Sequence, residues 1–215
     1  HELCELLDNS IEDVSTIRKL VTTILDLAQM NSLYMISDIQ EIRIREMIDQ
    51  IISDNAYLIH QKSLKVTNKI PDECLFFMSP MHFETVLGNL IGNAIKYSFI
   101  DGNVTIKAID QEDSIILSIK DEGIGIEPEH ISRVFDEFYR ADNSRHERGS
   151  HGLGLAIAKR VAEMYHGIIT VESDGAGKGS VFYLQLKKNP EVFLKKREGL
   201  IQSIRQKKKK KSGQM

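Results

Sequence analysis

The feature that most limits the folds open to this chain is a change in the spacing of its apolar residues. Between residues 81 and 97 they recur every three or four positions, which predicts an amphipathic helix. Over 104–108 and 114–120 apolar and polar residues alternate around an acidic turn, which predicts a β-hairpin. The same order then returns, as a helix over 153–166 and strands over 168–173 and 180–186. Helices interleaved with paired strands predict an α+β sandwich.

Other segments have simpler patterns. Residues 1–31 carry leucine, isoleucine and valine at helical spacing without Pro or Gly, which predicts one long helix of a bundle or coiled coil. We also expect a helix over 41–61, extended chain over 63–78 and a short helix over 128–134. Gly167 is expected to end the helix over 153–166, because glycine readily adopts the left-handed backbone at helix ends.

The net charge of −3 conceals two unlike regions. Residues 187–215 hold 11 Lys and Arg against 2 acids, whereas residues 1–186 have a net charge of −12. An acidic body argues against a nucleic-acid-binding protein, whose binding domain is expected to be basic. We expect the basic end, 189–215, to be a disordered tail, with contact to an anionic membrane surface as the lesser alternative.

Cysteine and apolar content indicate a cytoplasmic location. Cys4 and Cys74 are too few for a disulfide framework, and no CxxC pair is present for zinc. No apolar run reaches the roughly 18 residues that span a bilayer, and no signal peptide is visible. Because the sequence starts at His1 rather than Met, we expect an upstream segment in the full-length protein, which could carry a membrane anchor.

The first chemical pattern lies on the helix over 81–97. Asn89 and Asn93 are four residues apart and share a face, and Lys96 lies close to that face. An amide oxygen is a neutral ligand of the kind that Mg²⁺ accepts, and a lysine can neutralise a phosphate. Tyr97 adds an aromatic ring for a base. Alone, such a pair of asparagines is more often a cap or a solvated polar stripe.

The second pattern is DEGIGI, Asp121–Ile126, at the end of a predicted strand. Gly123 and Gly125 would let the backbone approach a ligand closely or adopt a positive φ. The carboxylate of Asp121 could accept a hydrogen bond from an exocyclic amine such as that of adenine. The alternative interpretation is a strand that ends in a tight turn.

Two further glycine-rich segments follow. In Gly149–Arg160 (GSHGLGLAIAKR) glycines run into a helix N-terminus, which predicts an anion site. This segment lacks the GK[ST] of a Walker A loop and the preceding strand of a Rossmann fingerprint. Gly175–Ser180 (GAGKGS) alone would be a hairpin turn. Between them Phe135–Arg140 (FDEFYR) has aromatic residues that could anchor a lid and an arginine that could reach a phosphate.

In this order the patterns resemble the N, G1, F, G2 and G3 boxes of the sensor histidine kinase ATP-binding domain. That domain belongs to the superfamily of gyrase, chaperone, histidine kinase and MutL ATPases. The match covers about residues 80–186, half of the chain. The resemblance implies a two-layer α/β sandwich, the Bergerat ATP-binding fold, preceded by a long N-terminal helix from a dimerisation hairpin.

The resemblance also implies roles at the base end of a nucleotide site. Tyr97 would lie against the adenine, Asp121 would hold the adenine amine, and Ser180 would lie near the base. Gly123 and Gly125 would admit the nucleotide.

At the phosphate end, the resemblance implies that Asn93 is the Mg²⁺ ligand. The other phosphate-binding residues would be Asn89, Lys96 and Arg140, with Gly152, Leu153, Gly154 and Leu155 wrapped around the phosphates. The resemblance implies that residues 126–151 form an ATP lid, and their polarity and lack of periodicity fit a segment that orders on nucleotide binding. ATP and Mg²⁺ are thus the expected cofactors.

The same resemblance divides the chain into three parts. Residues 1–32 would be the second helix of a phosphoacceptor hairpin, 33–188 the ATP-binding domain, and 189–215 the tail. His1, with Glu2 and Leu3, resembles the start of the phosphoacceptor signature, but the basic residue, Thr and Pro that should follow are absent. We therefore assign no catalytic residue and expect the acceptor histidine on an upstream segment or another subunit. Autophosphorylation by this chain alone is expected to fail.

The resemblance implies the catalytic part of a two-component sensor histidine kinase. It would bind Mg-ATP and transfer the γ-phosphate to a hairpin histidine, for relay to a response regulator receiver domain, and the full-length protein would be a homodimer. One alternative is an ATP-gated conformational ATPase of the same superfamily, which would need a transducer domain and a catalytic carboxylate. Another is an interaction module that needs no nucleotide, which the intact residues in every box disfavour.

Overall fold

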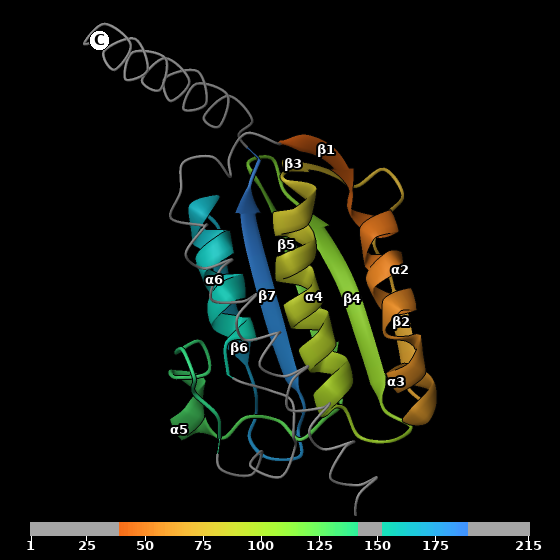
Figure 1. Cartoon of the computed structure of the whole chain (residues 1–215), viewed down its shortest axis with the longest axis vertical. Helices are drawn as coiled ribbons and strands as arrows, with labels where there is room; N and C mark the ends of the chain where they lie inside the picture. Colours follow the sequence, from red (N-terminus) through yellow and green to blue (C-terminus); the bar gives the residue numbers. More distant parts are fainter. Residues whose placement is uncertain (1–38, 142–151, 189–215) are drawn as a thin grey trace, which may run out of the picture.

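The computed structural model describes residues 39–141 and 152–188 (Figure 1). Its strands are β1 (Gln40–Arg43), β2 (Lys65–Asn68), β3 (Leu75–Met78), β4 (Asn103–Asp110), β5 (Ser114–Asp121), β6 (Ile168–Glu172) and β7 (Ser180–Lys187). Its helices are α2 (Ile44–Asp54), α3 (Ala56–Gln61), α4 (Pro80–Tyr97), α5 (Pro128–Ile131) and α6 (Gly154–Met164).

Five strands form one mixed sheet in the order β2-β4-β5-β7-β6. β2 is parallel to β4, and every other pair of neighbours is antiparallel. β1 and β3 form a separate antiparallel pair. Helices α2, α4 and α6 lie side by side on one face of the five-stranded sheet, with α4 in the middle (Figure 1). The described part of the chain is therefore the two-layer α/β sandwich that the sequence predicts.

Helix α4 is central because one side of it is apolar along its whole length. Pro80 occupies its first turn, where a missing N–H costs no helical hydrogen bond. Each large apolar side chain that is fully buried contributes about 1.5–3 kcal/mol to stability. The buried residues of α4 are His82, Phe83, Val86, Leu87, Leu90, Ile91, Ala94 and Ile95.

Strand β5 carries the core from the middle of the sheet to its end. Ile115, Leu117 and Ile119 are fully buried under the helices. Side chains alternate between the two faces of a strand, so Asp121 points to the same face as these isoleucines and leucine. A carboxylate thus stands at the end of an apolar row, where it is 3% exposed. The register pairs it with Ser180, the first residue of β7.

The prediction of one helix over 41–61 is wrong. The first residues of this range belong to β1, which pairs with β3 so that Ile42 lies opposite Phe76. The helical remainder is interrupted at Asn55, whose amide donates to the carbonyl of Ile51 at 2.8 Å. The backbone N–H of Asn55 also bonds to Ile51 and Ile52. This local capping ends α2, and α3 begins afresh at Ala56.

Two smaller expectations need correction. The helix expected over 128–134 is limited to α5, Pro128–Ile131. At the end of α6 the left-handed residue is His166, with φ +56°, and not Gly167. Gly167 is required for space instead, because a Cβ there would lie 2.8 Å from the carbonyl oxygen of Gln185 in β7.

The predicted helix over 1–31 and the predicted basic tail over 189–215 lie outside the described residues. Part of the predicted lid, residues 142–151, also lies outside them. Within the described residues, no helix is both long and apolar enough to cross a membrane.

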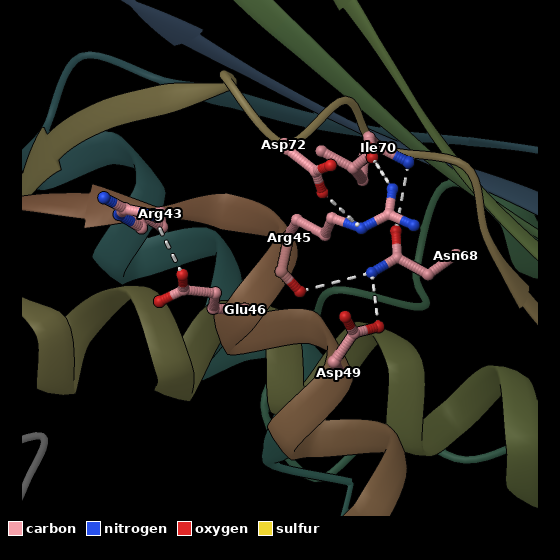
Figure 2. Close-up of polar contacts among 7 residues, drawn as sticks. All are labelled: Arg43, Arg45, Glu46, Asp49, Asn68, Ile70 and Asp72. Carbon is pink, nitrogen blue, oxygen red and sulfur yellow. Dashed lines mark hydrogen bonds and ion pairs between the residues drawn. The ribbon is translucent and has the colours of Figure 1, made fainter.

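A polar cluster joins the start of α2 to the connection between β2 and β3 (Figure 2). Arg45 forms an ion pair with Asp72 at 2.9 Å and donates to the carbonyl of Ile70. Asn68 donates to the carbonyl of Arg45 at 3.2 Å and to the carboxylate of Asp49 at 2.8 Å (Figure 2). We call these five residues the Arg45 network. It ties three segments together far from the C-terminal end of α4.

Candidate functional site

Four segments meet at the lower end of the sandwich in Figure 1: the end of α4, the end of β5, the start of β7 and the start of α6. The isolated bridge between Ser98 and Gly123 joins the end of α4 to the end of β5. The pairing of Asp121 with Ser180 joins β5 to β7. Twelve of the thirteen residues that the sequence nominates lie in or beside these segments, and Arg140 lies in the connection that leads to α6.

Asp121 is the buried acid of this end. The Ser180 hydroxyl donates to its Oδ2 at 2.5 Å, and the Ser180 N–H donates to its Oδ1 at 3.3 Å. Burial raises the pKa of Asp121 above its ordinary value, and the bonds from Ser180 and from the Gly123 N–H partly offset that rise. A carboxylate held this way keeps its remaining acceptor capacity for one more donor.

Tyr97 and Gly123 are in direct backbone contact. A Cβ at position 123 would lie 2.1 Å from the carbonyl oxygen of Tyr97, so only glycine allows β5 to approach α4 this closely. The N–H of Ile124 donates to the same carbonyl at 3.1 Å. The Lys96 ammonium lies 5.1 Å from the centre of the Tyr97 ring, a cation–π contact. An aromatic face and a cation thus lie next to the segment that follows Asp121.

The turn before β7 packs against the DEGIGI segment, backbone to backbone. Gly125 has φ +68°, and a Cβ on it would lie 2.1 Å from the carbonyl oxygen of Gly175. The N–H of Gly179 donates to the carbonyl of Gly123 at 3.0 Å. The hydroxyl of Ser173 accepts from the N–H of Ile126 at 2.9 Å. The glycines of the two segments are therefore needed for contact between the segments, a role that the sequence reasoning did not give them.

Asn89 of α4 lies against the start of α6. Asn89 donates to the carbonyl of Thr85 at 2.8 Å, and its Oδ1 would lie 2.4 Å from a Cβ at position 154. Gly154 therefore lets α6 begin against Asn89. Asn93 is one turn further along and half-buried.

Asn93 could hold Mg²⁺ only together with oxygens from water and from a ligand. No group of three or more His, Cys, Asp or Glu among the described residues could hold a metal ion. A metal here would be held by the Asn93 amide oxygen, by water and by oxygens of a ligand. Mg²⁺ accepts that donor set, because it keeps several waters and shares substrate phosphates.

The start of α6 has the geometry of an anion site. Gly152 has φ +68°, Leu153 caps the helix and is buried, and Gly154 and Leu155 form its first turn. The first N–H groups of an α-helix have no partner within the helix, and its dipole places partial positive charge there. These four nominated residues are therefore consecutive along the turn that begins α6.

Residues 135–139 are held to the start of α6, to β7 and to α5. The N–H of Phe138 donates to the carbonyl of Gly152 at 3.0 Å. Phe135 packs edge-on against Phe182 of β7, with ring centres 6.4 Å apart. The Tyr139 hydroxyl lies 2.7 Å from Nδ1 of His130 in α5. Phe138 and Gly152, which stand on either side of residues 139–151 in the sequence, are thus bonded to each other directly.

An open cavity of about 850 Å³ lies on the α5 side of this contact. Arg140 is the only one of the nominated residues that lines it. The others are Glu129, His130, Arg133, Asp136, Glu137, Phe138 and Tyr139. Neither Asp121 nor Ser180 lines this cavity.

Comparison with known proteins agrees with this geometry. Residues 78–190 match the family model described as histidine kinase-, DNA gyrase B-, and HSP90-like ATPase. The probable sensor kinase SilS of Salmonella typhimurium is 34% identical over 183 residues, 80% of this chain and 36% of that protein. The sensor histidine kinase WalK of Bacillus subtilis is 34% identical over 178 residues, 80% of this chain and 29% of WalK. The chain spans about a third of the length of these relatives.

Among solved structures, the Acinetobacter baumannii histidine kinase AdeS has the same fold. It superposes with a TM-score of 0.71 over 86% of this chain and 84% of that chain, at 22% identity. The catalytic domain of the histidine kinase ThkA superposes with a TM-score of 0.62 over 71% of this chain and 99% of that chain, at 21% identity.

Proposed function

The chain belongs to the family of histidine kinase-, DNA gyrase B-, and HSP90-like ATPases, and from this premise we propose that it is the catalytic, ATP-binding part of a two-component sensor histidine kinase. Family membership implies ATP binding. One observation supports the proposal most directly: Asp121, the Tyr97 ring and the first turn of α6 lie at the same end of one sheet. That end offers an acceptor, an aromatic face and an anion site to a single ligand.

We assign the base end of the nucleotide to Asp121, Ser180 and Tyr97. Asp121 accepts a hydrogen bond from the adenine amine, and the Ser180 hydroxyl holds the carboxylate in place. The Tyr97 side chain lies against the adenine ring. Gly123 and Gly125 support this end by letting the backbone after Asp121 pack closely against Tyr97 and Gly175.

We assign the phosphate end to Asn89, Lys96 and Arg140 and to the turn Gly152–Leu155. The N–H groups at the start of α6 donate to the phosphate oxygens, and the two cations neutralise charge. Asn93 would hold Mg²⁺ by its amide oxygen, and the ion, when bound, neutralises charge on the β- and γ-phosphates. The chain's own part in the reaction is to bind and orient the triphosphate.

The proposed reaction is phosphoryl transfer to a histidine. The γ-phosphorus forms a bond to a ring nitrogen of the acceptor, its bond to the bridging oxygen breaks, and ADP leaves with that oxygen. The acceptor lies on a hairpin of the same or another subunit, and a response regulator receiver domain takes the phosphoryl group from it. We further propose that residues 33–188 are the ATP-binding domain and that the full-length protein is a homodimer.

Nucleotide binding with and without Mg²⁺ tests the proposal. Isothermal titration with ATP should give saturable binding that Mg²⁺ strengthens, and Asn93→Ala should lose most of the Mg²⁺ effect while it keeps the affinity for adenosine. Absence of ATP binding to the wild-type chain would refute the proposal. Steady ATP hydrolysis by the full-length protein without acid-labile phosphohistidine would favour the ATP-gated ATPase instead.

A further inference from the structure

The C-terminal end of α4 is held by groups from outside the helix. The last carbonyls of any helix lack partners within it. In α4 the carbonyl of Tyr97 accepts from the N–H of Ile124 at 3.1 Å. The carbonyls of Lys96 and Ser98, one on each side of Tyr97, both accept from the Nζ of Lys62, the second at 2.9 Å. The backbone on both sides of Tyr97 is thus fixed by one ammonium group.

Lys62 is itself held in a defined place. It is the C-cap residue of α3, and its N–H donates to the carbonyl of Leu58 at 3.0 Å. Its carbonyl accepts from the N–H of Asp101 at 2.9 Å. Ser63, the next residue, turns the chain with φ +52° so that β2 can start. The Lys62 side chain therefore leaves from a backbone that is bonded both to α3 and to the turn after α4.

The electrostatics favour this contact. The C-terminal end of an 18-residue helix carries partial negative charge, and the Lys62 ammonium lies against it. Hydrogen bonds from a charged donor are about twice as strong as neutral ones, and these two are partly buried. Without the ammonium, two carbonyls on either side of Tyr97 would lose their donor.

We infer that Lys62 is a positioning residue for nucleotide binding: by holding the carbonyls of Lys96 and Ser98 it aims the Tyr97 ring at the adenine. It acts through Tyr97 and not by touching the nucleotide. The inference rests on the proposed function, because it needs a nucleotide at this end of the sheet. It adds a residue that lies outside every glycine-rich or asparagine motif of the sequence.

The test compares Lys62→Met with Lys62→Arg. Affinities for ATP and for adenosine are measured by displacement of a fluorescent ATP analogue, at a temperature where unfolding curves show each variant fully folded. Because Lys62→Met loses two charge-assisted hydrogen bonds, its affinities for ATP and for adenosine should both fall by about tenfold. The factor should be the same for adenosine as for ATP, because the misplaced ring contacts only the base. Lys62→Arg, which keeps a cationic donor, should restore most of the affinity.

Arg45→Met is the matched control. Arg45 is also a partly buried cation that donates to a backbone carbonyl, but it lies at the other end of the sandwich. Its removal should lower the unfolding midpoint and leave both affinities unchanged. Equal affinities for wild type and Lys62→Met, or an equal loss in Arg45→Met, would overturn the inference.

Two further results are informative. If Lys62→Met does not fold, Lys62→Gln, which keeps a neutral donor, takes its place against the same control and the same two outcomes. If the wild-type chain binds no ATP, the proposed function fails first. If wild type binds ATP and the Lys62 variants bind it equally well, only the positioning role fails.

Discussion

The two ends of α4 are built in different ways. At its C-terminal end, segments meet through their backbones, and all the left-handed glycines among the described residues, Gly125, Gly152, Gly175, Gly177 and Gly179, lie there. At its N-terminal end, contacts run through side chains. His82 meets Tyr165 at 2.7 Å, Phe83 stacks on Phe76 with ring centres 6.1 Å apart, and the Arg45 network holds the connection after β2.

Even the buried ionisable groups differ between the two ends. Burial raises the pKa of Asp121 at the C-terminal end and lowers the pKa of His82 at the N-terminal end. Asp121 has three hydrogen-bond donors around it. In His82 the buried Nε2 has no hydrogen-bond partner among the described residues. The first end surrounds a buried carboxyl with hydrogen-bond donors, whereas the second buries an imidazole whose neutral form burial favours.

The largest effect is expected from Gly123→Ala. The new Cβ would lie 2.1 Å from the Tyr97 carbonyl oxygen, so β5 must separate from α4. We expect a loss of about 3 kcal/mol in unfolding free energy and loss of ATP binding, measured by urea denaturation and titration. If Gly123→Ala were as stable as wild type, the close backbone packing at this end would be wrong.

Asp121→Asn should separate binding from stability. The Asn amide places a donor opposite the adenine amine, so ATP affinity should fall by about 10- to 100-fold. The unfolding free energy should stay the same or rise, because a buried charge is removed. Unchanged affinity in calorimetry would remove Asp121 from the site.

The pH dependence of wild-type binding follows from the same group. An ionised Asp121 accepts the amine, and protonation abolishes that role. Because the pKa of Asp121 is raised, the affinity for ATP should begin to fall at a higher pH than an ordinary aspartate would give. The decline should be absent in Asp121→Asn, and a titration series toward acid pH checks both.

At the other end, His82→Asn should alter stability and leave binding alone. His82 has a lowered folded pKa, so the unfolded chain binds more protons as the pH falls below about 6.5, and wild type loses stability there. The loss is about 1.4 kcal/mol for each unit by which the folded pKa lies below 6.5. In His82→Asn, whose amide can still meet Tyr165, this part of the pH dependence should vanish. If the unfolding free energy of wild type and of His82→Asn fell with the same slope toward acid pH, this role of His82 would be contradicted.

The smallest effect is expected from Gly88→Ala on the exposed side of α4. A Cβ there has no atom within 4 Å, so the substitution meets no obstacle. Alanine in place of a helical glycine should raise the unfolding free energy by about 0.5–1 kcal/mol with ATP affinity unchanged. It is also the matched control for Gly123→Ala, and a destabilised Gly88→Ala would show that glycine has a packing role on both sides of the helix.

Local patterns were sufficient for most of the fold. The apolar stripe of α4 and the alternation in β4 and β5 predicted these elements almost to the residue, because the core they face is set by their own spacing. The prediction of one helix over 41–61 failed because β1 exists only through its pairing with β3, more than 30 residues later. The prediction that Gly167 is the left-handed residue after α6 was wrong, because that residue is His166. Gly167 is needed for a close approach to β7, which is a tertiary constraint that the local sequence does not show.

The nominated site residues came from motifs, and the structure brings most of them to one end. Lys62 could not be found in this way. It stands between a helix and a strand in the unremarkable sequence QKS, and its partners are 34 and 36 residues away. The contact between Gly125 and Gly175 is also long in range, so the sequence predicted these glycines only as ligand contacts or as turns.

The hydrogen bond between Phe138 and Gly152 has a consequence for how this chain can change over evolution. It joins Phe138 directly to the residue before Leu153 and α6, so this contact is made by the two backbones themselves. The entropic cost of closing a loop grows only with the logarithm of its length, about 0.6 kcal/mol for each doubling. A change in the number of residues between Ala141 and Gly152 is therefore expected to cost the fold little.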